Sequence, residues 1–287
     1  MREPAVAGTF YRRGRDILRE QVGKCFSHPL GPGRIPALAK AGARRLKGAI
    51  FPHAGYEYSG PIAAHSAGAL ATDGFPPSFV IIGPNHRGFG SDIAVGTETF
   101  QTPLGKVDVD TELARQIIGG GIDEDPVAHI EEHSIEVQLP FLQFFGREFR
   151  FVPVCMGNQD IESAMLLGER IAAAAADRDV AIIASTDFTH AGPGYGHPAP
   201  RGMRAGDYAR QEDKKASDRI LAMDPRGLVE TVRKNRITMC GYGCVAAMLV
   251  ATQKLGARKA TLLKYATSAD VSGDDDMAVG YGAFIIE

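Results

Sequence analysis

Hydrophobic residues recur along the chain in short runs rich in valine and isoleucine, separated by longer stretches of mixed polarity. Six such runs predict β-strands, at 47–53, 78–86, 92–100, 149–156, 179–190 and 277–287, the fifth of them running out into a loop. Continuous apolar runs of this length are typical of strands that are buried on both faces of a sheet. The pattern therefore predicts a sheet that helices cover on both sides.

The stretches between these runs carry apolar residues at helical spacing. They predict helices at 15–28, 60–74, 110–120, 160–177, 205–223 and 224–233, and one that begins near 243. Asp110 and Gly74 are typical residues for a helix start and a helix end. The segment 132–145 also has helical periodicity, and Pro140 predicts a break or kink inside it. Alternating strands and helices, without a linker-like change in composition, predict one α/β domain over 1–287.

Composition and charge exclude several classes of function. The 287 residues are 44% hydrophobic and carry a formal net charge of -2, which argues against nucleic acid or an anionic membrane as a partner. No apolar run reaches the roughly 20 residues that span a bilayer, and the N-terminal segment lacks the apolar core of a signal peptide. Four cysteines do not make a disulfide framework here and fit a reducing compartment. We therefore expect a cytoplasmic protein.

Polar residues follow three of the predicted strands where each strand ends. His53 and His86 each come shortly after a proline that follows an apolar run, and Asp187 and His190 follow the run that begins at 179. Ligands of open α/β sheets bind just beyond the carboxyl ends of the strands, so we expect these side chains to meet in one pocket. His133 lies just before the helical pattern of 132–145 and is either part of a helix cap or a further pocket residue.

Two cysteines, Cys240 and Cys244, flank a glycine-rich turn that leads into the last predicted helix. Thiols at helix N-termini have lowered pKa values and are good metal ligands. Two histidines with one cysteine suit a catalytic iron, zinc or copper ion. Asp187 would then orient a ligand, and His190 would act as general base. A metal-free hydrolase that pairs Cys240 with His190 remains the alternative. The acidic turn 274–276 is interpreted as solvated rather than as a cation site.

Six sequence blocks occur in an order characteristic of one protein family. They read PHAGYEYSG, GPNHRG, TPLGKVDVD, EHSIEVQLPFLQ, STDFTH and CGYGCVAA, between a start AVAGTFY and an end YGAFII. In these blocks the chain resembles, over essentially its whole length, the Memo family, whose prokaryotic members are also known as protein B of the AmmeMemoRadiSam system. The resemblance implies a single-domain α/β/α sandwich with a central mixed sheet, similar to that of LigB-type class III extradiol dioxygenases.

The resemblance also implies roles for individual residues. His53 and His86 match the two metal-ligating histidines of the family, and Cys240 matches the cysteine that stands where the dioxygenases have a glutamate. Asp187 and His190 match two other polar groups of the pocket, and His190 lies at the place of the dioxygenase base. His133 matches an additional pocket histidine, and Tyr58 lies in the tyrosine-rich first block.

Two functions follow from the resemblance together with the pocket residues. The first is a redox enzyme that acts on a small organic substrate through non-haem iron, with copper or zinc as the other candidate metals. The second is a protein that has lost dioxygenase chemistry and binds a metal, a peptide or a partner. The name of the system implies AMMECR-type and radical SAM proteins as partners.

Overall fold

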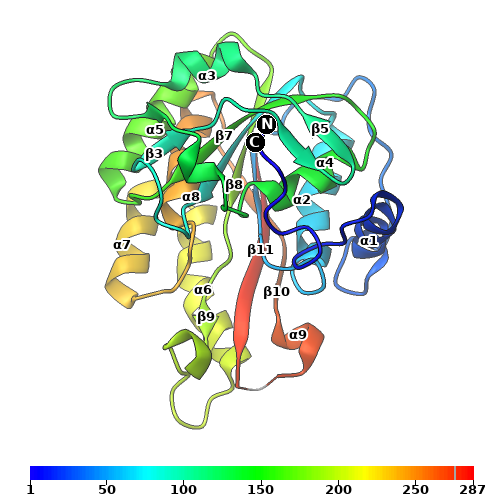
Figure 1. The fold of residues 1–287 in the computed structure, drawn as a ribbon. Helices are drawn as coiled ribbons and strands as arrows, with labels where there is room; N and C mark the ends of the chain where they lie inside the picture. Colours follow the sequence, from blue (N-terminus) through cyan, green and yellow to red (C-terminus); the bar gives the residue numbers. More distant parts are fainter. Residues whose placement is uncertain (275) are drawn as a thin grey trace.

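A mixed β-sheet runs through the centre of the protein in the computed structural model, which describes residues 1–274 and 276–287 (Figure 1). The acidic turn interpreted above as solvated includes Asp275, which lies outside the described residues. The strand order is β10-β11-β1-β8-β2-β7-β3-β6, and β9 pairs with β11. The strands are β1 (Gly48–Phe51), β2 (Ser78–Pro84), β3 (Ile93–Val95), β6 (Asp123–Glu124), β7 (Arg150–Met156), β8 (Val180–Ser185), β9 (His190–Ala191), β10 (Ala260–Thr267) and β11 (Ala278–Ile286).

The centre of the sheet is parallel and its flanks are antiparallel. Strands β1, β8, β2 and β7 run in the same direction. Strand β11 is antiparallel to β1, and β3 is antiparallel to β7. The strands β4 (Phe100–Thr102) and β5 (Gly105–Val107) form a separate two-stranded sheet. Because parallel strands end at the same edge, the segments after β1, β2 and β8 emerge side by side.

Helices cover both faces of the sheet, as the sequence predicts. Helix α8 packs on β1, β2 and β8, and α2 packs on β1, β10 and β11; Figure 1 shows α5, α7 and α8 on one side of the sheet and α1, α2 and α4 on the other. The helices are α1 (Arg15–Ser27), α2 (Gly60–Asp73), α3 (Thr111–Ile117), α4 (Leu139–Gln143), α5 (Ile161–Ala175), α6 (Ala205–Leu221), α7 (Pro225–Asn235), α8 (Tyr242–Lys254) and α9 (Ala269–Ser272), and the single-turn 3-10 helices are η1 (Val127–His129), η2 (Glu136–Gln138) and η3 (Pro193–Tyr195).

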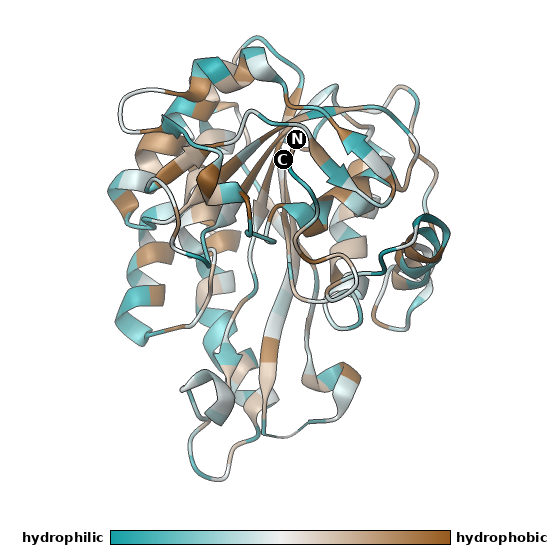
Figure 2. Cartoon of the chain, viewed as in Figure 1, coloured by the Kyte–Doolittle hydropathy of each residue, from teal (hydrophilic) through white to brown (hydrophobic). Residues whose placement is uncertain are grey.

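The apolar runs become the core. Every residue of β1, β2 and β8 is buried, and Figure 2 shows these central strands as hydrophobic between helices whose outer faces are hydrophilic. Asp110 caps α3 as predicted, because its carboxylate accepts a hydrogen bond from the Leu113 amide at 3.0 Å. Gly74 ends α2 with a φ of 89°, a conformation that favours glycine. No helix within the described ranges is both long and apolar enough to cross a bilayer.

Two predicted elements are wrong in extent. The strand predicted at 92–100 is β3 followed by a turn and β4, because the next position of β7 along the β3 ladder is Pro153, which has no amide proton to donate. The helix predicted at 132–145 is η2 followed by α4. Pro140 lies in the first turn of α4, where no amide donor is needed, so it starts a helix instead of kinking one.

Candidate metal centre

Three histidines meet at the carboxyl edge of the parallel strands. His53 follows β1, His86 follows β2, and His133 lies three residues before η2. One ligating atom from each lies within 4.8 Å of those of the other two. The His86 and His133 rings stack with centroids 4.7 Å apart, and the His53 ring lies at right angles to them at 5.1 Å and 5.4 Å. Three imidazoles at this spacing can share one metal ion.

The hydrogen bonds around Ser185 determine which nitrogen of His53 carries the proton. The Ser185 hydroxyl lies 2.7 Å from the Ser134 carbonyl oxygen, which can only accept, so the single hydroxyl proton points there. The same hydroxyl oxygen accepts a hydrogen bond from Gln138 Nε2 at 2.9 Å. His53 Nδ1, 2.8 Å from that oxygen, must therefore be the donor. The neutral ring keeps its lone pair on Nε2, the atom that is free to bind a metal.

Glu132 orients the other two histidines, although the sequence analysis did not single it out. It is buried, and its Oε1 lies 3.0 Å from His86 Nδ1 and 3.4 Å from His133 Nδ1. The amides of His86, His133 and Ser134 also donate to this carboxylate, at 2.6, 2.8 and 2.8 Å. A carboxylate hydrogen bonded to Nδ1 leaves Nε2 as the metal-binding atom, so the His86 ring has the same tautomer as His53, and His133 Nδ1 faces the same oxygen. The pair Glu132-His133 in the block EEHS was the signal that could have found it.

His133 is not a helix cap. The 3-10 helix η2 begins after Ile135, and the His133 ring instead packs edge-on against Phe10 with centroids 4.7 Å apart. Phe10 belongs to the N-terminal segment, far from His133 in the sequence. Long-range packing therefore decides between the two interpretations that the sequence left open, and it places His133 in the histidine cluster.

The charges of the cluster suit a metal site. Burial first of all, and then the neighbouring imidazoles, lower the pKa of His53 well below its ordinary value. Burial likewise lowers the pKa of His133 to about 4, against the opposing charge of Glu132. For Glu132, burial would raise the pKa, but the hydrogen bond from His86 and the nearby imidazoles outweigh it and lower the pKa to about 2. At neutral pH, His53 and His133 are therefore uncharged, the form that binds metals, beside one ionised carboxylate.

Cys240 adjoins the cluster, with Sγ 3.1 Å from His53 Nε2. It precedes α8, as expected, but the predicted lowering of its pKa is wrong. Burial, and next the charge of Asp187, raise the pKa of Cys240 far above its ordinary value, although the Asp187 amide donates to the sulfur at 3.2 Å. The thiol is thus protonated in the metal-free protein, and a metal ion must displace its proton. Cys244 is buried inside α8.

Asp187 and His190 lie on the segment that follows β8. The His53 amide donates to Asp187 Oδ1 at 2.7 Å, and burial raises the pKa of Asp187 against the opposing charge of His190. His190 Nδ1 lies 3.0 Å and 3.1 Å from the carbonyl oxygens of Phe188 and Thr238. Both can only accept, so Nδ1 carries the proton and His190 Nε2 is free to accept another. This is the arrangement that a general base requires.

One exposed tyrosine, Tyr195, adjoins this part of the site. Tyr58 is 37% exposed and Tyr195 is 44% exposed. The Tyr195 ring packs edge-on against His190 with centroids 5.3 Å apart. Burial, then the charge of Asp187, and more weakly Tyr58, raise the pKa of Tyr195. Tyr58 lies just before α2, and its role as a substrate residue stays a prediction.

Asp213 supports that segment from α6 and makes folding stability depend on pH. Its carboxylate accepts hydrogen bonds from the Thr189 amide at 2.9 Å and the Tyr265 hydroxyl at 2.6 Å, yet burial raises its pKa to about 7. The unfolded chain titrates near the ordinary value, so the folded state binds the proton more tightly. The stabilisation from protonated Asp213 is complete below about pH 4 and is lost as the pH rises to about 7.

We expect Asp213→Asn to remove this pH dependence, because the amide never ionises. Its oxygen still accepts from the Thr189 amide, and its NH2 group can donate to the Tyr265 hydroxyl oxygen. Urea unfolding at each pH gives the unfolding free energies of the unsubstituted protein and of the variant. The difference between these two free energies should change by about 4 kcal/mol at most between pH 4 and pH 7. The exposed Asp218→Asn is the matched control on the same helix. Parallel pH profiles for all three proteins would contradict the assignment.

Fold and site together define an α/β protein with a histidine-rich candidate metal site at the carboxyl edge of its parallel strands. The family model described as Memo-like protein matches residues 2–285, so the chain belongs to the Memo family, as predicted. It is 47% identical over 290 residues to a MEMO1 family protein of Methanopyrus kandleri, covering 99% of this chain and 98% of that one. A MEMO1 family protein of Methanothermobacter thermautotrophicus is also 47% identical, with 98% of each chain covered.

A solved structure shares the fold. The uncharacterized protein of Escherichia coli K12 aligns with a TM-score of 0.56 over 84% of this chain and 100% of its own, at 12% identity. This likeness supports the α/β architecture with its central mixed sheet.

Proposed function

We propose that the protein binds one transition-metal ion through Nε2 of His53 and His86, with Cys240 Sγ as the anionic ligand and His133 as a further imidazole. The observation that carries this proposal is the shared tautomer. Ser185 and Glu132 hold the protons of His53 and His86 on Nδ1, so that both lone pairs stay on Nε2. The short contact between Cys240 Sγ and His53 Nε2 adds a sulfur donor at the same place.

The donor set suits iron, copper or zinc, and the dioxygenase-like fold that the sequence resemblance implies favours non-haem iron. Bound iron or copper would supply the redox chemistry that amino-acid side chains lack. Around it, His190 Nε2 would accept a proton from the substrate, since Phe188 O and Thr238 O hold the other ring proton. Asp187 keeps His53 in place through the His53 amide. Tyr58 and Tyr195 would contact a small organic substrate through their exposed rings.

Metal content tests the site. We expect near-stoichiometric iron or copper, by mass spectrometry, in protein purified without oxygen, and its loss in His86→Ala and His53→Ala. His65→Ala is the matched control, because the ring of His65 bonds to Leu30 O and lies outside the cluster. Equal metal content in all of these proteins, or none in the unsubstituted protein, would refute the proposed centre.

Two further variants separate the ligands. Cys240→Ser should weaken metal binding and shift any sulfur-to-metal absorption band, whereas His133→Ala should weaken binding without moving that band. If Cys240→Ser changes neither, the sulfur is not a ligand and the ion is held by the three histidines alone.

A second function, binding of a peptide or partner in a repurposed cleft, is favoured by the exposure of the site. The His86 side chain is 31% exposed and Tyr195 is 44% exposed, so the rim is open to a larger ligand. This function predicts that His190→Ala retains binding of the partner and that no small molecule is turned over. Multiple-turnover chemistry that depends on His190 would exclude it.

A further inference from the structure

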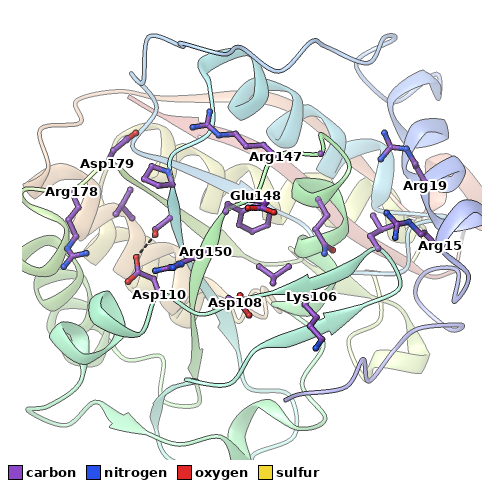
Figure 3. A pocket seen from close by; sticks show the side chains of 18 residues that line it. Arg15, Arg19, Lys106, Asp108, Asp110, Arg147, Glu148, Arg150, Arg178 and Asp179 are labelled. Atoms are coloured by element: carbon purple, nitrogen blue, oxygen red, sulfur yellow. Dashed lines mark hydrogen bonds between the residues drawn. The ribbon is translucent and has the colours of Figure 1, made fainter.

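A charged cavity of about 1080 Å³ lies at the opposite edge of the sheet from the histidines (Figure 3). Its lining includes Ser78, Arg150 and Val180, the first residues of β2, β7 and β8. The histidine cluster instead follows the last residues of β1 and β2. We call this cavity the basic cleft. Its position makes it independent of the proposed metal centre.

The cleft concentrates positive charge on a chain whose overall charge is negative. Cations in its lining exceed acids by two, whereas the whole chain has a formal net charge of -2. The cations come from four places in the fold. Two lie on α1, one lies on β5, two lie before or at the start of β7, and one lies just before β8. They are Arg15, Arg19, Lys106, Arg147, Arg150 and Arg178.

Three of the four acids of the cleft are hydrogen bonded or ion paired. Asp110 caps α3 and accepts a hydrogen bond from the Ser78 hydroxyl at 2.5 Å. Asp179 pairs with Arg44 at 2.9 Å, and Asp108 accepts from Thr99 Oγ1 at 2.8 Å. Only Glu148 has neither an ion pair nor a hydrogen bond to its side chain within the described part of the chain. Among the described residues, no acid of the cleft forms an ion pair with a cation of the cleft.

Four of the cations are available to a ligand. Within residues 1–274 and 276–287, no hydrogen bond or ion pair engages the side chains of Arg15, Lys106, Arg147 or Arg150, and all four are exposed. Figure 3 shows their labelled side chains spread around the cleft rather than converging on one point. A single small anion would reach only some of them. A ligand that carries several separate negative charges would reach all of them.

We propose that the basic cleft binds an acidic segment of a partner protein. Five of the six cations are arginines, which pair with carboxylates through two parallel hydrogen bonds and are enriched in protein interfaces, where lysine is depleted. The volume lies above the range of about 300 to 1000 Å³ that is typical of small-molecule pockets. Leu104 in the lining is half-buried and adds apolar surface against which a peptide can pack.

Fluorescence anisotropy with a labelled glutamate-rich peptide tests the proposal on the full chain. We expect binding that weakens as salt rises and that falls by about tenfold in Arg147→Glu/Arg150→Glu. The control is Arg34→Glu/Lys234→Glu, which changes the net charge equally at exposed positions outside the cleft and should bind like the unsubstituted protein. Metal content and urea midpoints should stay the same in both variants.

Three results would overturn the proposal. Equal weakening in both double variants would show unspecific charge attraction. Absence of peptide binding at low salt would exclude acidic peptides as ligands of the cleft. Binding of inorganic tripolyphosphate at the cleft, with no peptide binding, would assign the cleft to a small phosphorylated molecule instead. Each can occur whether or not the histidines bind a metal, so the two proposals fail separately.

Discussion

Replacing Arg2 by alanine is expected to lower the free energy of unfolding by about 3 to 5 kcal/mol. Arg2 is 4% exposed, and its guanidinium forms an ion pair with the fully buried Glu136. It also donates to the carbonyl oxygens of His129 and Glu132. Removing it leaves a carboxylate in the interior with no cation beside it, which costs far more than the loss of an exposed pair.

The loss should appear as a lower urea midpoint with an unchanged slope, because the chain still unfolds over the same surface. Arg2→Met/Glu136→Gln is the informative second variant. It removes both charges, and a glutamine oxygen in the place of Oε1 still accepts from the Tyr11 hydroxyl and the Val6 amide, while the Ala5 amide loses its acceptor. We expect it to recover part of the lost stability, because the unpaired buried charge is gone. Lys24→Ala, which breaks an exposed pair with Glu20, should cost less than about 0.5 kcal/mol. If Arg2→Ala lowers the free energy of unfolding no more than Lys24→Ala does, the result contradicts the buried ion pair.

Replacing Ser185 by alanine is expected to weaken metal binding by about 10- to 100-fold, the usual effect of removing a hydrogen bond that orients a metal ligand. Without the Ser185 oxygen, the proton of His53 is no longer held on Nδ1. The ring can then place its proton on Nε2, where it blocks the ion. Competition with a chelator measures the affinity. Nitrogen NMR of the His53 ring should show unprotonated Nε2 in the unsubstituted metal-free protein and a mixture in the variant.

Ser66→Ala is the matched control for this substitution. Ser66 is also fully buried, and its hydroxyl donates to Ile50 O on the strand that precedes His53, but it contacts no histidine of the cluster. We expect it to lower stability to a similar degree while leaving metal affinity unchanged. If both serine variants lose affinity equally, the effect comes from loosened packing and not from the tautomer of His53.

The sequence by itself determined the parallel centre of the sheet with β11, most helices and the position of two histidines of the cluster, but not the strands β6 and β10. Apolar runs such as 48–51 and 79–83 have no polar face, which is typical of strands buried on both sides, and their order along the chain follows directly. His53 and His86 come immediately after such runs. Since parallel strands end at one edge, local pattern alone predicts that these two side chains approach each other. The six family blocks also identified the family, because their residues and their order can be read from the sequence itself.

Only the tertiary structure decided how the site is completed. Glu132 orients His86 and Ser185 orients His53, which lie 46 and 132 positions away in the chain. The neighbouring His133 is a local signal for Glu132, but nothing local indicates these two distant partners. The pKa of Cys240 depends on its burial against Asp187, which reverses the expectation from its place before a helix. The basic cleft likewise gathers charges from separate elements. Protonation and charge depend on surroundings that form only when distant segments pack together, and a linear pattern does not contain them.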